Sequence, residues 1–159
     1  MAWPKYYTPP FTFPNAVEVL VTGAGNYQYA LEDGPWQEEN IFANLGYGEH
    51  RISVRDRLGC AVEDMTINII DYPKYFTPNG DGYHDSWNIS SLRLETTAKI
   101  YIFDRYEKLL KELRPTGDGW DGTFNGSPMP SDDYWFLVEF FGNDSDELNR
   151  FKSHFTLKR

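Results

Sequence analysis

The densest cluster of oxygen-bearing side chains runs from Asn79 to Asp85. Amide and carboxylate oxygens at short spacings in a glycine-containing loop are the ligands of calcium loops of the EF-hand type. Asn79, Asp81 and Asp85 would then bind calcium, although the loop lacks an acid at its first place and a glutamate at its last. The alternative is a turn in which Gly80 and Gly82 take positive φ and the polar side chains bond nearby backbone amides. Both hypotheses stay open, and no other cofactor is expected.

Groups suited to catalysis are few and scattered. The histidines, His50, His84 and His154, are far apart, and no nucleophile, phosphate-binding or dinucleotide-binding motif occurs. Carboxylates brought together by folding, such as Asp121 and Asp133, are the one arrangement left for an enzyme, as in a glycoside hydrolase. We therefore expect no enzymatic activity.

The chain is rich in aromatic residues, with 5 Trp, 11 Tyr and 11 Phe. Four tryptophans are candidates for a sugar-stacking platform in an adhesive or carbohydrate-binding module: Trp36, Trp87, Trp120 and Trp135. Small all-β domains commonly place such residues in their cores. We therefore expect these four to be core residues.

Composition and charge exclude several classes of protein. The 159 residues carry a formal net charge of -9, which disfavours nucleic-acid binding through phosphate contacts. The single cysteine, Cys60, rules out a disulfide scaffold, and no Cys/His cluster suits zinc. No stretch approaches the ~20 apolar residues of a membrane span, and the N-terminus lacks the pattern of a secretory signal. The chain therefore either stays inside the cell or is a fragment of a longer exported protein.

Apolar residues alternate with polar ones over most of the chain, which is the period of half-buried strands. We expect strands over 17–21, 51–55, 66–69, 100–103, 134–141 and 151–157. The last two are aromatic enough to suggest strands covered on both faces. Residues 109–113 are left open between helix and strand. Gly, Pro, Asn and Asp recur about every 8 to 12 residues, which favours β-sandwiches.

A domain boundary is expected at residues 71–73, where a strand ends and a turn-rich stretch begins. We predict an all-β chain of two Ig-like antiparallel β-sandwich domains in tandem, residues 1–71 and 72–159. One internal repeat is visible, since Trp3–Pro9 matches Tyr72–Pro78 at five of seven positions.

A series of motifs in residues 72–159 carries a resemblance to a known family. In chain order they are Phe76-Thr77-Pro78-Asn79-Gly80-Asp81-Gly82, Asp85-Ser86-Trp87, Ile102-Phe103-Asp104-Arg105-Tyr106, Gly119-Trp120-Asp121-Gly122-Thr123, Asn125-Gly126, Pro130-Ser131-Asp132-Asp133-Tyr134-Trp135 and His154-Phe155-Thr156-Leu157-Lys158-Arg159. This ordered series resembles the gliding motility-associated C-terminal domain, the type B sorting domain of the type IX secretion system in Bacteroidota. Two positions depart from the family pattern, because Glu107 and Ser153 stand where glycine is usual. Glycine at the first of these would supply the positive φ of a hairpin turn.

The resemblance also implies which residues form the sorting signal. They are Phe76, Thr77, Pro78, Asn79, Gly80, Asp81, Gly82, Asp85, Trp87, Phe103, Asp104, Arg105, Tyr106, Trp120, Asp121, Gly122, Pro130, Tyr134, Phe155, Leu157, Lys158 and Arg159.

Residues 16–71 are similar to the Ig-like repeats that often precede this domain in bacterial surface adhesins. The similarity rests on the segments Gly25–Leu31, Asp33–Gln37, Phe42–Leu45, Gly48–His50 and Val54–Cys60. It implies a spacer or stalk unit.

The resemblance implies that residues 72–159 are a secretion signal. The parent protein would carry an export signal in a part that this fragment lacks, reach the periplasm, and be secreted or displayed on the cell surface by the type IX translocon. The folded domain would be what the outer-membrane machinery recognises, with a small outer-membrane β-barrel protein as a partner. The places to look for that contact are the sheet edges, the Asn79–Asp85 turn, the Asp104–Lys108 hairpin and the last strand. The alternative is an adhesive or carbohydrate-binding β-sandwich module.

Overall fold

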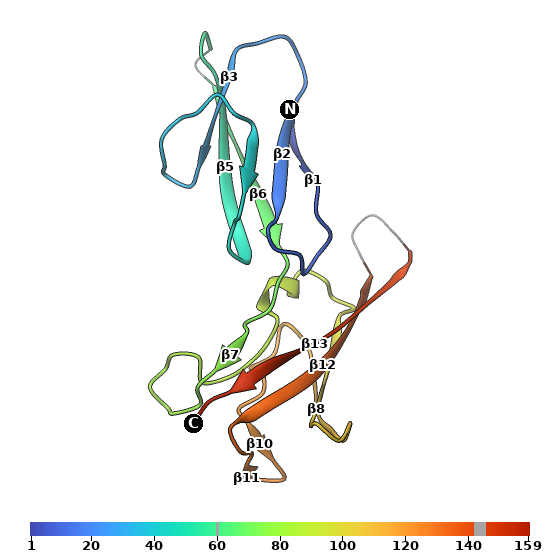
Figure 1. Cartoon of the computed structure of the whole chain (residues 1–159). Coiled ribbons are helices and arrows are strands. Elements are labelled where there is room, and N and C mark those ends of the chain that lie inside the picture. Colours follow the sequence, from blue (N-terminus) through green and yellow to red (C-terminus); the bar gives the residue numbers. More distant parts are fainter. Residues whose placement is uncertain (60, 142–145) are drawn as a thin grey trace. The chain divides into compact units, whose positions relative to one another are not determined.

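The computed structural model describes residues 1–159 except residue 60 and residues 142–145, so Cys60 lies outside the described residues. Contacts divide the chain into two compact units, Met1–Asp71 (unit 1) and Tyr72–Arg159 (unit 2), which are described separately. Among the described residues the one helical element is a short 3-10 turn, η1 (Ser90–Leu92), in unit 2 (Figure 1). The predicted all-β class is therefore confirmed.

Unit 1 contains two three-stranded antiparallel sheets. The first has the order β1-β2-β4, with β1 (Ala2–Tyr6), β2 (Ala16–Val21) and β4 (Ile41–Ala43). The second has the order β3-β5-β6, with β3 (Tyr27–Leu31), β5 (Gly48–Asp56) and β6 (Val62–Ile69). Alternate residues of both sheets meet in one buried cluster, made up of Val17, Val19, Tyr29, Phe42, Leu45, Ile52, Val54, Ile67 and Ile69. The unit is therefore a two-layer sandwich whose core follows the period-2 pattern of the sequence.

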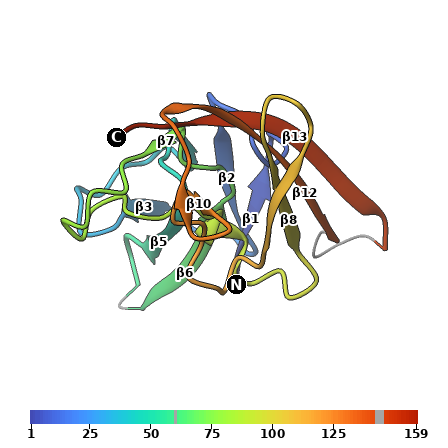
Figure 2. The same ribbon diagram turned by 90° about the horizontal axis from the view of Figure 1, so that it is seen from below.

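Unit 2 is built on a five-stranded sheet with the order β7-β13-β12-β8-β9. Its strands are β7 (Tyr75–Phe76), β8 (Lys99–Phe103), β9 (Leu109–Leu113), β12 (Asp132–Phe141) and β13 (Leu148–Leu157). Figure 2 shows β12 lying between β8 and β13. The β7–β13 pair is parallel and the other three pairs are antiparallel. The segment left open by the sequence, 109–113, is thus a strand at the edge of this sheet.

One face of the five-stranded sheet carries the core of unit 2. Its buried side chains include Ile100, Ile102, Phe136, Val138, Phe155 and Leu157. The segments between the strands cover this face of the sheet. Four of their side chains are fully or almost fully buried: Trp87, Ile89, Leu92 and Trp120. A two-stranded ribbon, β10 (Thr123–Phe124) and β11 (Ser127–Pro128), completes the unit. A specific Ig-like topology stays a prediction for both units.

The opposite face of the sheet is open. Residues along β12 alternate between buried and less buried, and Trp135 and Phe141 are 39% and 40% exposed. Lys152 and His154 are exposed on β13. The prediction that these two strands are covered on both faces is therefore wrong. Aromatic content misled it, because aromatic side chains also pair across strands on a solvent-facing surface.

Candidate functional site

The aromatic residues of the predicted signal gather in one buried cluster. Phe76, Trp87, Trp120, Tyr134 and Phe155 are each at most 2% exposed. The Trp87 ring stacks on Phe155 with centroids 3.9 Å apart and an interplanar angle of 10°. Trp120 lies edge-on to Tyr134 at 5.0 Å, and Phe76 contacts Phe155 at 5.9 Å. These motif residues, and the fully buried Leu157 beside them, therefore act as core rather than as surface contacts.

Each polar group on these buried rings has a backbone partner. The Trp87 indole donates to the Pro73 carbonyl and the Trp120 indole to the Thr123 carbonyl, both at 2.8 Å. The Tyr134 hydroxyl donates to the Pro130 carbonyl at 2.8 Å, and burial raises the pKa of that hydroxyl. Because a buried donor without a partner is costly, these bonds fix the rings in one arrangement.

Two glycines allow the cluster to close. Gly119 has φ +87°, and a Cβ there would lie 2.7 Å from the Trp87 carbonyl oxygen. Gly122 has φ +80°, and a Cβ there would lie 2.8 Å from Leu157 Cδ1. Both positions combine a left-handed backbone with close packing, so a side chain there would strain the backbone and displace its neighbours. Gly122 in the predicted signal is thus explained by packing.

The Asn79–Asp85 segment forms a hydrogen-bonded turn around the Asp85 carboxylate. Asp85 Oδ1 accepts bonds from the amides of Asn79 (3.1 Å) and Gly80 (2.7 Å), and Oδ2 accepts one from Gly82 (2.7 Å). These amides hold the pKa of Asp85 below its usual value. Asp81 similarly accepts from the Tyr83 amide at 2.8 Å. Gly80 and Gly82 both have positive φ, at 78° and 84°.

This geometry is that of the turn alternative. Thr77 begins the loop, and its amide donates to the His84 carbonyl at 2.7 Å. The Thr77 carbonyl accepts a bond from the Asn79 amide, two residues further along the chain. Within the described residues, no group of three or more His, Cys, Asp or Glu side chains is placed to hold a metal ion. The calcium hypothesis for Asn79, Asp81 and Asp85 stays a prediction.

The turn between β8 and β9 is organised by Asp104. Its Oδ1 accepts bonds from the amides of Tyr106 (2.8 Å) and Lys108 (3.0 Å). Glu107 has φ +62°, so this position is left-handed, as the glycine of the family pattern implies. A non-glycine residue in that conformation costs about 1 kcal/mol. The turn keeps its shape because the Asp104 bonds hold it.

Ser153 is the other position that departs from the family pattern. Its Oγ atom lies within hydrogen-bond distance of the Tyr72 hydroxyl, at 2.9 Å.

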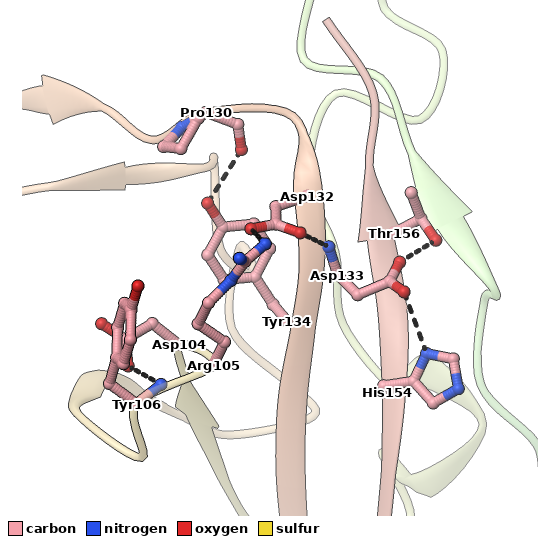
Figure 3. A network of polar contacts seen from close by, with 9 residues as sticks. All are labelled: Asp104, Arg105, Tyr106, Pro130, Asp132, Asp133, Tyr134, His154 and Thr156. Carbon is pink, nitrogen blue, oxygen red and sulfur yellow. Dashed lines mark hydrogen bonds and ion pairs between the residues drawn. The ribbon is translucent and has the colours of Figure 1, made fainter.

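A polar network joins this turn to the two longest strands, as Figure 3 shows. Arg105 pairs with Asp132, which raises the pKa of the Arg105 guanidinium. The Asp133 amide and Arg105 together lower the pKa of Asp132. Asp133 in turn accepts a 2.6 Å bond from Thr156 Oγ1 and lies 3.9 Å from His154 Nδ1. The network braces three chain segments against one another.

The two carboxylates considered for catalysis both take part in local hydrogen bonds. Thr156 donates its hydroxyl proton to Asp133 at 2.6 Å. Asp121 accepts from both the amide and the hydroxyl of Thr123, at 3.0 and 2.7 Å, and these bonds lower its pKa. A general acid in a glycoside hydrolase needs a raised pKa. The lowered pKa of Asp121 therefore argues against a general-acid role for that residue, and Asp133 takes part in the polar network around Arg105.

The last two residues hold the end of β13 to β7 and to neighbouring loops. The Lys158 amide donates to the Phe76 carbonyl at 3.0 Å. The Arg159 guanidinium donates to the carbonyls of Met129 and Gly122, both at 2.8 Å. Lys158 Nζ also lies 4.5 Å from the centre of the Tyr75 ring. The terminal motif thus has a structural role at this edge of the unit.

The four tryptophans considered for sugar stacking differ in their surroundings. Trp87 and Trp120 are core residues, as expected. Trp36 is half-buried, with the Arg55 guanidinium 4.1 Å above its ring. The expectation of a core position is wrong for Trp135, which is 39% exposed. Its place on the solvent-facing side of β12 follows from the alternation that buries its neighbours, Tyr134 and Phe136.

Sequence reasoning missed the surface around Trp135. A hollow of about 510 Å³ lies there, lined by Phe103, Asp104, Arg105, Glu107, Trp135 and Lys152. Asp104, Arg105 and Glu107 lie in the hairpin, and Lys152 in the last strand, that were predicted as contact regions. The exposed side of β12 around Trp135 was not predicted as a surface. The alternation in 132–141 was a usable signal, because it puts Asp133, Trp135 and Leu137 on one side of the strand.

A comparison with protein families decides what this unit is. The model of the CHU_C type IX secretion signal domain matches residues 70–157, which is more than half of the chain. The chain belongs to this family. The matched range coincides almost entirely with unit 2, so the secretion signal domain is the unit that holds the aromatic cluster, the Asp85 turn and the Asp104 hairpin.

Other comparisons add little. No curated protein matches the chain. A solved structure of a biofilm associated protein, its BSP domain, aligns with 97% of this chain at 13% sequence identity and a TM-score of 0.29. The chain spans 29% of the length of that structure. A TM-score this low carries no argument about fold or function.

Membership in the family establishes a coarse role. A type IX secretion signal domain associates with the type IX secretion system and belongs to a secreted or cell-surface protein. A signal role in an all-β fold suggests a non-enzymatic function. No helix in the described part of the chain is long and apolar enough to cross a membrane.

Proposed function

We propose that unit 2 is a sorting domain of type B that the outer-membrane translocon recognises in its folded state, after the protein has reached the periplasm. The observation that carries this proposal is the burial of the motif residues. Phe76, Trp87, Trp120 and Phe155 are spread over the sequence and meet only in the folded core. A linear peptide with these residues would present a different surface from the folded domain, so recognition of the fold accounts for the motif as a whole.

The predicted signal residues then have two roles. The buried aromatic residues and Gly122 hold the fold, together with the neighbouring Gly119. The exposed turns around Asp85 and Arg105, and the sheet surface between them, offer the contacts. A small outer-membrane β-barrel protein that works with the translocon is the proposed partner. Residues 1–71 serve as an Ig-like spacer that carries the signal domain at the end of a longer surface protein.

The experiment fuses residues 1–159, or 72–159, behind an export signal and a fluorescent reporter. Reporter is measured in the medium and on cells, in strains with and without a working type IX translocon. We expect secretion only with the translocon and only when residues 72–159 are present. Secretion that is equal in both strains, or that persists when residues 72–159 are deleted, would contradict the proposal. Secretion of the longer fusion alone would assign residues 1–71 to the signal.

Recognition of the folded state is tested by Trp87→Ala, which empties the centre of the aromatic cluster. The matched control is Trp3→Ala, the same change at a residue that is 40% exposed and lies outside the matched range. We expect Trp87→Ala to be retained in the periplasm and Trp3→Ala to be secreted like the parent. If an unfolded Trp87→Ala variant is secreted normally, the translocon reads a linear signal.

A further inference from the structure

The open face of the five-stranded sheet presents apolar side chains in register across β9, β8 and β12, with polar residues of β13 beside them. Leu109 of β9 lies opposite Phe103 of β8, Phe103 opposite Trp135 of β12, and Trp135 opposite His154 of β13. The next row along the strands includes Tyr101, Leu137 and Lys152. We call Phe103, Leu109, Trp135, Leu137 and Lys152 together the Trp135 face.

The Trp135 face has the composition of a protein interface. Leu109 is 49% exposed and Trp135 39% exposed, with Phe103 and Leu137 half-buried between them. The hollow of about 510 Å³ opens here, so a side chain of a partner has room beside the Trp135 ring. Among the bonds of the described residues, none engages the Trp135 indole N–H. Exposed aromatic residues beside a hollow, with a polar rim, are the usual energetic centre of such interfaces.

The charges around the hollow define the partner further. Arg105 is already paired with Asp132, and the Asp104 carboxylate accepts the amides of its own turn. Lys152 is exposed and has no ion-pair partner among the described residues. Glu107 in the turn is likewise unpaired there and would repel a carboxylate placed at that end. A partner carboxylate is therefore favoured next to Lys152 and Leu137, away from the turn.

From this arrangement we propose that the Trp135 face binds an extended acidic segment of an outer-membrane protein of the translocon. In this mode an apolar side chain of the segment packs on Trp135 and Phe103. A carboxylate pairs with Lys152, and a carbonyl accepts the indole N–H of Trp135. The inference rests on the proposed function, since it names the surface through which the folded domain is recognised.

Two other occupants fit this face less well. A sugar ring stacked on Trp135 would have charged groups at the rim of the hollow, but Phe103 and Leu137 would meet it with apolar side chains. A second copy docked face to face about a twofold axis would bring the two unpaired Lys152 side chains to one interface. An acidic segment of a different protein instead places a carboxylate beside Lys152.

Binding is tested with immobilised synthetic peptides that tile the exposed loops of the translocon's outer-membrane proteins. The soluble probe is the chain of residues 1–159, as the parent, Trp135→Ala, Lys152→Glu and Lys111→Glu. Lys111→Glu is the matched control, because Lys111 is an exposed lysine of the same sheet that does not line the hollow. All variants are first compared by thermal unfolding, and Lys152 is exposed enough for its reversal to leave the fold intact.

We expect the parent chain to bind peptides that combine acidic and apolar residues. Trp135→Ala should weaken binding by about thirtyfold and Lys152→Glu by about tenfold or more, with Lys111→Glu unchanged. Replacing the acidic residues of a binding peptide by lysine should restore its binding to Lys152→Glu. No acidic peptide binding, or equal loss in Lys111→Glu, would overturn the proposal. So would glycan-array binding lost in Trp135→Ala, or a concentration-dependent dimer lost in Lys152→Glu.

The secretion assay separates failure of this inference from failure of the proposed function. If the parent fusion is secreted equally without the translocon, the proposed function itself fails. If the parent fusion needs the translocon but Trp135→Ala and Lys152→Glu are secreted like Lys111→Glu, only the assignment of the docking face fails. Translocon-dependent secretion that falls in Trp135→Ala and Lys152→Glu alone would support both.

Discussion

Units 1 and 2 are both built from strands, yet they fill their cores differently. The core of unit 1 is mainly aliphatic, with Val17, Val19, Ile52, Val54, Ile67 and Ile69 at its centre. The core of unit 2 combines aliphatic residues with a cluster of aromatic rings, and bonds from Trp87, Trp120 and Tyr134 to backbone carbonyls fix three of those rings. Aliphatic cores adapt to substitutions of similar volume. A core of hydrogen-bonded rings specifies one arrangement, which suits a unit whose surface is to be recognised.

The two units also differ in how the repeated segment at the start of each unit pairs with other strands. Trp3 to Tyr6 lie in β1, which pairs antiparallel with the next strand of the chain, β2. In the matching segment, Tyr75 and Phe76 form β7, which pairs in parallel with the last strand, β13. The two similar sequences therefore form strands that differ in partner and in direction of pairing. The likeness is one of sequence and does not extend to strand pairing.

The largest expected effect is that of Trp87→Ala. Removing a fully buried aromatic side chain costs about 3 to 5 kcal/mol, comparable to the whole stability of a small domain. Unit 2 should unfold, whereas unit 1 should keep its stability because its core contains no residue of unit 2. Hydrogen exchange followed by mass spectrometry reports each unit separately. Equal loss of protection in peptides around Ile52 and Ile67 would show that the two units are not independent.

A smaller effect is expected for Gly119→Ala. A left-handed alanine costs about 1 kcal/mol or more, and the added Cβ also meets the Trp87 carbonyl oxygen at 2.7 Å. The control is Gly80→Ala, which has a similar φ of +78° but open space around its Cβ position. We expect Gly119→Ala to destabilise unit 2 by about 1 to 3 kcal/mol more than Gly80→Ala. Chemical denaturation measures the difference. Equal losses would mean that close packing at residue 119 is unimportant.

Acid should weaken unit 2 more than unit 1. Hydrogen bonds lower the pKa values of Asp85, Asp121 and Asp132 in unit 2 and of Glu18 in unit 1. A carboxylate with a lowered pKa stabilises the fold above its unfolded pKa of about 4. That contribution to stability is lost as the pH falls through the lower pKa that the carboxylate has in the folded state. Burial raises the pKa of Glu95, which acts in the opposite direction.

The measurement for this acid effect is thermal unfolding of each unit between neutral pH and about pH 3. Asp85→Asn should reduce the pH dependence of unit 2, since an amide cannot lose this charge. A pH dependence that is unchanged in Asp85→Asn, or that is larger for unit 1 than for unit 2, would contradict the expectation.

The smallest effect is expected from calcium. The Asp85 oxygens already accept three backbone amides, so a cation would have to compete with those bonds. We expect the melting temperature of unit 2 to stay unchanged at about millimolar calcium, the range of weak extracellular sites. A rise that follows RT ln(1 + [L]/Kd), and that is lost in Asp81→Asn, would instead establish the calcium site.

In unit 1 the sequence predicted β2, β5 and β6, because alternation and burial agree there, as at Val17 and Val19, but it did not predict β1, β3 or β4. The family resemblance implied a positive φ at residue 107, where glycine is usual, and Glu107 has φ +62°. The sequence prediction failed for Trp135, since an aromatic residue in a strand fits either face and only the burial of its neighbours decides which. The hollow beside Trp135 was out of reach because it depends on the register of β8, β12 and β13.

The parallel pairing of β7 and β13 has a mechanical consequence. Tension applied between Tyr72 and Arg159 would draw β7 backward and β13 forward along their common direction. The bonds from the Thr156 amide to the Lys74 carbonyl and from the Lys158 amide to the Phe76 carbonyl, both 3.0 Å, would then share the load at the same moment. A pair loaded in shear must break these bonds together, whereas a pair opened from one end loses them one by one. Unit 2 should therefore resist unfolding when tension is applied between its two ends.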